Sequence, residues 1–386
     1  MNNILTQKIE DFSTSLVGEY IKNFQRENST HKTIAPEKIR NYLKNLIQLY
    51  EKTGFLYPEK KKRIQPHMDL IKDNWQAALK LDDQLLSIIL FIGEDSKKEK
   101  LTSISFWRTT YNSWVAQHLV STGFPVGVCA MMLKAQAEVR FDQHRYLSFQ
   151  NWFSHDNNFA NQVFGTLVKT IGSKYACVKL YYYVGVKKIK KLKSNNISIK
   201  IFQQDMTEEL HDLHCRIRGS IDAKAEEING MDIGLDHLDQ IYRKAGSRRK
   251  RYVWIASFKQ KTKAIGAAIV YRGPFGLNFS LLENRCDLLI DQTLTKEQQQ
   301  VVIHNLLAEA FKAYYEFDLD LPFPINYIPI ITDKTSAKII ESSGGTLLRK
   351  YCKSIWLRDA FEDWYKHIQK QYEIFLSKRY GKQAAP

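Results

Sequence analysis

Cysteine is scarce in this sequence, and the spacings typical of metal sites are missing. The five cysteines are odd in number, form no CxxC pair and are scattered along the chain at Cys129, Cys177, Cys215, Cys286 and Cys352. This pattern argues against a disulfide framework and against a four-cysteine zinc site. His211, His214 and Cys215 have helical i, i+3, i+4 spacing, but no complementary His/Cys pair is evident elsewhere. We therefore expect no metal.

A long apolar segment is also missing. The most apolar stretch, residues 85–92 (LLSIILFI), is much shorter than the roughly 20 residues that a membrane-spanning helix needs. The first residues (MNNILTQKIEDFSTS) lack a basic segment followed by an apolar one, so they do not resemble a secretory signal. We expect a cytoplasmic protein without a transmembrane segment.

Acidic residues are outnumbered by basic ones. The 386 residues include 57 Lys and Arg against 41 Asp and Glu, which gives a net charge of +16. Such an excess attracts nucleic acid, anionic membrane surfaces or phosphate-bearing cofactors such as coenzyme A. Because the charge is spread along the whole chain, a basic surface that only aids solubility explains it equally well.

Two short basic runs stand out. The densest is Arg248, Arg249, Lys250 and Arg251, followed by Tyr252 and Trp254. Basic residues interleaved with aromatic ones can hold phosphates and stack bases, so this cluster is a candidate nucleic-acid site. The alternative is a charged loop that enters a strand. For the other run, residues 59–63 (EKKKR), we expect a solvated loop.

The composition, 44% hydrophobic and 12% aromatic, is sufficient for packed cores in two or three domains. Residues 1–84 are expected to be helical, because apolar residues recur at helical spacing between Pro36 and Gly54. A run with linker composition, KKIKKLKSNN, then separates an α/β domain at 85–196 from a second domain at 197–386.

The second half predicts a clear order of elements. A short strand at 198–204 precedes two helices, and a hairpin at 251–273 precedes a third strand at 279–292. A long helix follows, with Thr295 as its N-cap and Gln298 completing a capping box. The chain continues with a strand, a short helix ending at Gly344 and Gly345, a last strand and a final helix.

This order, together with the segment TDKTSAKIIESSGGTLLRKY, resembles the GNAT acyltransferase fold over about residues 198–358. Residues 124–186 repeat the strand–helix–strand centre of that fold, which predicts a degenerate second copy within 85–190. The predicted fold class is therefore α/β (α+β), a GNAT-like and tandem mixed sheet with an N-terminal helical region.

The resemblance implies transfer of an acyl group from acetyl-CoA or another acyl-CoA to an amine acceptor. The donor pyrophosphate is expected at the start of the long helix, where helix N–H groups favour anions. The implied contacts are Ile290, Gln292, Thr295 and Gln298. Backbone N–H groups of the splayed central strand polarise the thioester carbonyl, and a carboxylate takes the proton from the amine.

Glu283 and Asp287 are the candidate bases, because strand alternation puts them on one face with Arg285 between them. An ion pair on a solvated face is the alternative. The turn at 291–299 contains no glycine, and the carboxylates of Asp291 and Glu297 repel an anion. That departure favours a catalytically inactive GNAT-like scaffold that binds RNA or a protein partner.

A third function, an aminoacyl-tRNA-dependent transferase, also fits paired GNAT-like domains with a basic surface. The sequence leaves open whether the chain is an enzyme. An open cleft between the strands at 279–292 and 325–332 favours catalysis, whereas a filled cleft opposes it.

Overall fold

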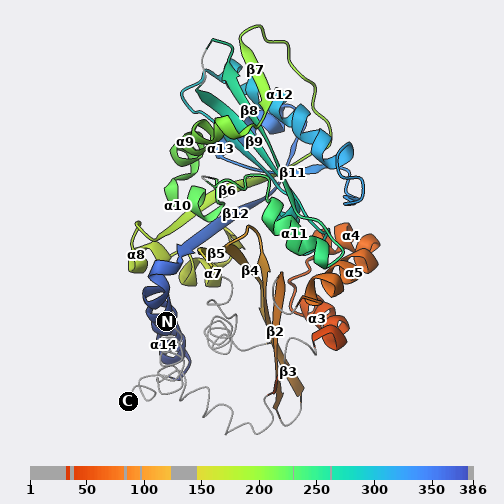
Figure 1. The fold of residues 1–386 in the computed structure, drawn as a ribbon. Helices are drawn as coiled ribbons and strands as arrows, with labels where there is room; N and C mark the ends of the chain where they lie inside the picture. Colours follow the sequence, from red (N-terminus) through yellow and green to blue (C-terminus); the bar gives the residue numbers. More distant parts are fainter. Residues whose placement is uncertain are drawn as a thin grey trace.

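The computed structural model describes residues 32–34, 39–81, 85–95, 98–122, 146–228, 230–260 and 263–380. In these residues the chain forms one 12-stranded sheet with helices packed along it (Figure 1). In the described part of the chain, no helix is both long and apolar enough to cross a membrane.

The sheet contains two copies of one strand order. The first six strands are β1 (Lys32–Ile34), β2 (Leu86–Asp95), β3 (Lys98–Arg108), β4 (Ser113–Ser121), β5 (Ser148–Ser154) and β6 (Ala176–Val186). The second six are β7 (Ile197–Ile201), β8 (Lys250–Phe258), β9 (Ala264–Arg272), β10 (Cys286–Ile290), β11 (Ile328–Thr332) and β12 (Thr346–Leu357). From one edge the order is β1-β2-β3-β4-β5-β12-β6, and from the other it is β7-β8-β9-β10-β11-β6-β12. We call these the N-terminal and C-terminal units.

The two units exchange their last strands. β12 lies between β5 and β6, and β6 lies between β12 and β11, with all three pairings antiparallel. The only parallel pairs in the described sheet are β4 with β5 and β10 with β11, which occupy equivalent places in the two units. The predicted mixed, tandem sheet is thereby confirmed. The domain boundary at 187–196 falls in the connection from β6 to β7 and stays a prediction, because the units share one sheet.

The C-terminal unit confirms the main predicted elements. β8, β9 and β10 are consecutive antiparallel strands, and α12 (Lys296–Tyr315) begins at the capping box of Thr295 and Gln298. The third strand is shorter than expected, because residues Leu282–Asn284 form a 3-10 helix, η4. Leu281 has a left-handed φ of 60°, and Asn284 bonds both the N–H and the C=O of Gly273. These contacts fold the chain into a compact loop before β10, so the placement of Glu283 on the strand was wrong.

The helices before β2 are α3 (Ile39–Lys52), α4 (Pro58–Ile64), the 3-10 helix η2 (Gln65–His67) and α5 (Met68–Leu79). The predicted solvated loop at 59–63 was wrong, since these residues belong to α4. Pro58 starts the helix at a position that tolerates proline, and Lys60 and Ile64 lie one turn apart on its buried face.

The helices of the region before β2 contact the C-terminal unit. The indole N–H of Trp75 donates to the Gly276 carbonyl at 2.7 Å, and Arg63 donates to the Phe279 carbonyl at 3.0 Å. One apolar core runs through α3, β2, β8 and α12, with Leu46, Leu90, Val253 and Ile303 among its buried residues. These helices therefore share one hydrophobic core with the C-terminal unit (Figure 1).

The remaining helices cover the sheet and its ends. They are α7 (Asn158–Val163), α8 (Leu167–Ile171), η3 (Gln204–Met206), α9 (Thr207–Arg218), α10 (Ser220–Ala225), α11 (Asp236–Lys244), α13 (Lys334–Ser342), η5 (Arg358–Ala360) and α14 (Phe361–Tyr380). Figure 1 shows α9 and α10 on one side of the C-terminal unit and α12 on the other. The parallel pairs β4–β5 and β10–β11 are thus held at the centre of each unit.

Candidate functional site: two strand openings and a cavity

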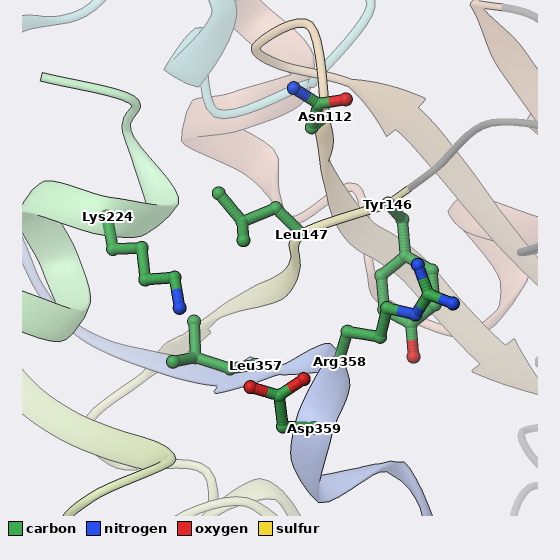
Figure 2. A pocket seen from close by; sticks show the side chains of 7 residues that line it. All are labelled: Asn112, Tyr146, Leu147, Lys224, Leu357, Arg358 and Asp359. Carbon is green, nitrogen blue, oxygen red and sulfur yellow. The ribbon is translucent and has the colours of Figure 1, made fainter. Parts of the chain in front are cut away.

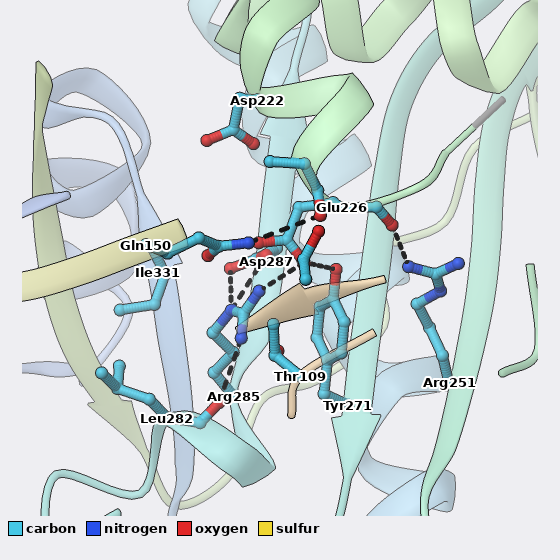
Figure 3. A network of polar contacts seen from close by, with 12 residues as sticks. Thr109, Gln150, Asp222, Glu226, Arg251, Tyr271, Leu282, Arg285, Asp287 and Ile331 are labelled. Atoms are coloured by element: carbon cyan, nitrogen blue, oxygen red, sulfur yellow. Dashed lines mark hydrogen bonds and ion pairs between the residues drawn. The ribbon is translucent and has the colours of Figure 1, made fainter. Parts of the chain in front are cut away.

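Charged side chains form a buried cluster behind β10 and β12. Its six members are each 2% exposed or less: Arg218, Asp222, Glu226, Arg285, Asp287 and Lys353. The Lys353 amine contacts Asp222 at 2.9 Å and Glu226 at 2.7 Å. Arg285 contacts Glu226 at 2.9 Å and Asp287 at 3.1 Å, and Figure 3 shows how these side chains converge.

This cluster is neutral as a whole, because three cations balance three carboxylates. Burial alone raises the pKa of Glu226, but Arg285 and Lys353 outweigh it and hold that pKa below its usual value. Asp287 accepts from Arg285 and also contacts Arg218 at 3.1 Å. The candidate base Asp287 is therefore part of a structural ionic network that ties β10, α9, α10 and β12 together.

Glu283, the other candidate base, lies apart from this network. Its Oε1 accepts the Gly276 N–H at 2.7 Å, and its Oε2 has no hydrogen-bond partner in the described residues. Its side chain is fully buried, and this burial raises its pKa to about 7. The two carboxylates thus sit in different environments. Asp287 forms ion pairs with two arginines, whereas Glu283 forms none in the described residues, although the Arg249 guanidinium bonds its backbone carbonyl.

The opening between β10 and β11 is bridged by the protein's own side chains. The strands pair at Cys286 with Ile330 and at Asp287 with Ile331, and then separate. Beyond that point the Thr332 hydroxyl donates to the Leu288 carbonyl at 3.2 Å. The amide of Gln292 donates to the Ile290 carbonyl at 3.0 Å and to Asp333 at 3.4 Å.

The start of α12 is also satisfied from within. Thr295 accepts the Gln298 N–H, and Gln298 accepts the Thr295 N–H. Asp291 accepts the Thr293 N–H at 3.0 Å. The four residues expected to contact the acyl donor do lie together at this turn: Ile290, Gln292, Thr295 and Gln298. Their hydrogen bonds, however, go to the turn itself and to Asp333.

The equivalent opening in the N-terminal unit has a different geometry. β4 and β5 pair from Ser113 with Ser148 to Ala116 with Asn151 and then separate. Against β3, Gln117 and Val120 oppose Ser105 and Ser103, so β4 carries one extra residue in a β-bulge. His118, inside the bulge, has a left-handed φ of 54°. A bulge bends its strand, and here it bends β4 just where pairing with β5 stops.

A cavity of about 750 Å³ lies in this opening, and we call it the β4 cavity. Its described lining comes from α4 and the loop before it, β4, β5, α7, the loop before β10, and β12. Its lining includes Phe55, Tyr57, Lys60, His118, Ser154 and Arg349. Volumes of this size are typical of small-molecule sites. Neither Glu283 nor Asp287 is among the described lining residues.

Lys60 is the unusual side chain of the β4 cavity. It is 4% exposed, and no described carboxylate lies within ion-pair distance of its amine. Its pKa is lowered to about 7, mainly because the amine is buried and to a smaller extent because the cations Arg63 and Arg349 lie nearby. Sequence reasoning missed this residue, although the i, i+4 spacing of Lys60 and Ile64 after Pro58 was a usable signal for the helix.

The basic run at 248–251 is divided between core and surface. Arg249 and Arg251 are buried and donate to backbone carbonyls, including those of Thr109 and Ile233. Arg248 and Lys250 form ion pairs with Asp239. The four side chains therefore do not form a single exposed cationic patch.

No group of three or more His, Cys, Asp or Glu suited to a metal occurs in the described residues, and His214 bonds Asp222 at 2.8 Å. A smaller cavity of about 350 Å³ lies at the opposite end of β4 and β5 (Figure 2). Its lining includes Lys224, Arg358 and Asp359, which mixes both charges.

The sequence matches no known protein-family profile and no curated protein. Among solved structures, it is similar to a tandem GNAT protein from the clavulanic acid biosynthesis pathway (9% identity, 85% of this chain, 98% of that chain, TM-score 0.40). A putative acetyltransferase from Pyrococcus horikoshii (9%, 85% and 89%, 0.39) and a GNAT-family acetyltransferase from Colwellia psychrerythraea (10%, 85% and 99%, 0.34) are also similar. Likeness at this level concerns the order of helices and strands, so we base function on the residues of this chain.

Proposed function

We propose that this protein transfers an acyl group from a coenzyme A thioester to an amine, and that the β4 cavity of the N-terminal unit is the reaction site. The observation that carries the proposal is the contrast between the two openings. The β4–β5 opening has a bulge and a cavity of about 750 Å³, whereas side chains bridge the β10–β11 opening. The proposed site is therefore not the turn at 291–299 in the C-terminal unit, where the sequence predicted it.

The chemistry follows from the separated strands. Beyond Ala116, the side of β4 that faced β5 has no strand partner in the described register, so its backbone groups border the cavity. When bound, an acyl-CoA would supply the thioester carbonyl and the thiolate leaving group, and this thiolate would take up the proton that the amine loses. Preorganised N–H groups aimed at that carbonyl oxygen would stabilise the charge that develops on it. In this proposal Glu283 and Asp287 have structural roles, because both carboxyls are fully buried.

The sequence after β4 also supports this unit. Gly123 and Gly127 follow β4 directly, whereas the turn after β10, residues 291–299, contains no glycine. Glycine lets a backbone approach a phosphate closely. The placement of both glycines lies outside the described residues, so this support comes from the sequence alone.

Calorimetric titration with acetyl-CoA tests the site. Ser154→Trp puts a large side chain into the β4 cavity, and Gln292→Trp is its matched control at the C-terminal opening. We expect Gln292→Trp to bind like the unaltered protein and Ser154→Trp to bind at least about tenfold more weakly. If instead Gln292→Trp weakens binding and Ser154→Trp does not, the donor binds at the turn at 291–299. Absence of binding to the unaltered protein at millimolar acetyl-CoA would reject the enzyme and favour the scaffold.

A nucleic-acid-binding scaffold is the second candidate, and one surface favours it. The connection from β6 to β7 carries exposed lysines at Lys187, Lys188, Lys190, Lys191 and Lys193. Asn305 holds its backbone against α12 through two bonds to Leu192, at 2.9 and 3.0 Å. An aminoacyl-tRNA-dependent transferase would use this surface and the β4 cavity together.

A salt titration of RNA binding tests the lysine surface. Log affinity falls by roughly 0.7 per contacted phosphate for each tenfold rise in salt. Replacing Lys187, Lys188, Lys190 and Lys193 with serine should flatten that slope by several contacts, while Arg248→Ser should not. An unchanged slope would remove this surface from the proposal.

A further inference from the structure

The β4 cavity has a one-sided charge. The charged residues among its described lining are Lys60 and Arg349, and no Asp or Glu is among them. Arg63 lies close behind and contributes to lowering the Lys60 pKa. In the described part of the chain, none of these three cations makes an ion pair. This is the opposite of the cluster behind β10, where every cation has a carboxylate partner.

An unpaired ammonium that is 4% exposed is energetically costly. The amine either loses its proton, which the lowered pKa favours, or keeps it by pairing with an anion. The aromatic rings beside it, Phe55 at 4.3 Å and Tyr57 at 5.0 Å, favour the cation by about 2 kcal/mol, which is less than the several kcal/mol that burying an unpaired charge costs. The Tyr57 ring also contacts a second cation, because the Arg349 guanidinium lies over it at 4.3 Å. Lys60 and Arg349 thus converge on Tyr57 from different elements, α4 and β12.

Resting on the proposed function, we propose that the β4 cavity binds an acidic group, a carboxylate or a phosphate, between Lys60 and Arg349, and that the amine acceptor carries it. Two cationic side chains provide the donors for such a group. Tyr57 supports both, and Arg63, held by Tyr327 and the Phe279 carbonyl, adds positive potential behind them.

The position of Lys60 favours the acceptor over the donor as the source of the anion. Lys60 packs on Phe55, whose ring lies 5.2 Å from that of His118, the bulge residue. The proposed carbonyl site is at this bulge. In coenzyme A a long pantetheine arm separates the thioester from the phosphates, so a donor with its carbonyl at the bulge holds its own phosphates away from Lys60. The acidic group near Lys60 then belongs to the other substrate.

Binding of simple anions to the full chain tests the site without any acyl donor. The probes are sulfate, which stays a dianion between pH 6 and 8, and glutarate, with neutral glutaramide as the matched control. We expect sulfate or glutarate, but not glutaramide, to bind in calorimetry. Because Lys60 must be protonated to bind an anion and has a pKa of about 7, affinity should be about tenfold higher at pH 6 than at pH 8.

Three substitutions separate the contributions. Lys60→Met should weaken binding at least about tenfold and abolish its pH dependence, whereas Arg349→Met should weaken binding and keep the pH dependence. Lys62→Met, an exposed position on the same helix, should change neither. Lys60→Met removes an uncompensated buried charge, so we expect its thermal midpoint to equal or exceed that of the unaltered protein.

Two results would overturn the inference, and a third separates it from the proposed function. If Lys60→Met binds the anion as tightly as the unaltered protein does, the anion does not bind at Lys60. Competitive displacement of sulfate by coenzyme A would assign the anion to the donor and end the acceptor assignment. Lys60-dependent sulfate binding without any acetyl-CoA binding would reject acyl transfer, and with it the acceptor, but keep the anion site.

Discussion

Removing the Lys353 charge is the most direct test of the buried ionic cluster. Lys353→Met keeps most of the side-chain volume but leaves three carboxylates against two cations. Asp222 and Glu226 lose contacts of 2.9 and 2.7 Å in a region that solvent does not reach. Breaking a buried ion pair by removing one partner costs about 3–5 kcal/mol, because the charge that remains is uncompensated.

This free energy converts to a modest change in melting temperature. The sheet is continuous through both units, so we expect them to unfold together. The entropy of unfolding is about 2.1 cal/mol/K per residue, which for a chain of 386 residues makes 3–5 kcal/mol equal to about 4–6 °C. Lys350→Met, an exposed position on the same strand, should shift the midpoint by less than about 1 °C.

A double variant distinguishes charge balance from packing. Lys353→Met with Glu226→Gln restores two cations against two carboxylates, so its loss of stability should be smaller than the sum of the two single losses. Scanning calorimetry of the unaltered protein, the two single variants, the double variant and Lys350→Met measures these losses. Strict additivity, or a loss from Lys353→Met no larger than that from Lys350→Met, would refute the account of the cluster as a mutually dependent ionic network.

Two further predictions concern other buried groups. The Glu283 pKa is raised in the folded state to about 7, so the folded chain holds a proton that the unfolded chain releases, and stability falls as pH rises from about 4.5 to 7. Glu283→Gln should remove this pH dependence and stabilise the protein at pH 8 by up to about 3 kcal/mol, and a variant that is less stable than the unaltered protein at pH 8 would contradict the assignment. In the basic run, Arg249→Ser and Arg251→Ser should each destabilise the fold by more than about 2 kcal/mol, because they leave buried carbonyls without donors, whereas Arg248→Ser should cost less than about 1 kcal/mol. Urea denaturation of the three variants checks this order, and equal losses would mean that the buried arginines contribute no more than the surface one.

Local sequence patterns predicted the elements that local contacts define. The capping box at Thr295 and the apolar period after it located α12, and the short polar turn between β8 and β9 located their hairpin. The loop before β10 was predicted as strand, because η4 depends on contacts between Asn284 and Gly273 and on the left-handed Leu281. Neither the Asn284–Gly273 contacts nor the left-handed φ of Leu281 is indicated by the local sequence around Glu283.

The site depends on contacts that no local pattern contains. The β4 cavity combines Lys60, His118 and Arg349, which are far apart in sequence and meet because β12 crosses into the N-terminal unit. A lysine in the run EKKKR is most often solvated, and only the packing of α4 against the sheet buries this one. The tandem fold was accessible from element order, but the choice of unit for the cavity was not.

The exchange of β6 and β12 constrains how the chain can be made and divided. During synthesis the N-terminal unit has β5 and β6 available long before β12, which ends at Leu357, emerges. Until then, the edges of β5 and β6 that later receive β12 are open to other chains, a state prone to aggregation. A fragment that ends at residue 196 lacks β12, the strand that pairs with these edges of β5 and β6 in the full chain. Each unit therefore completes its sheet only with a strand that the other unit supplies, so the two units are expected to fold and persist together.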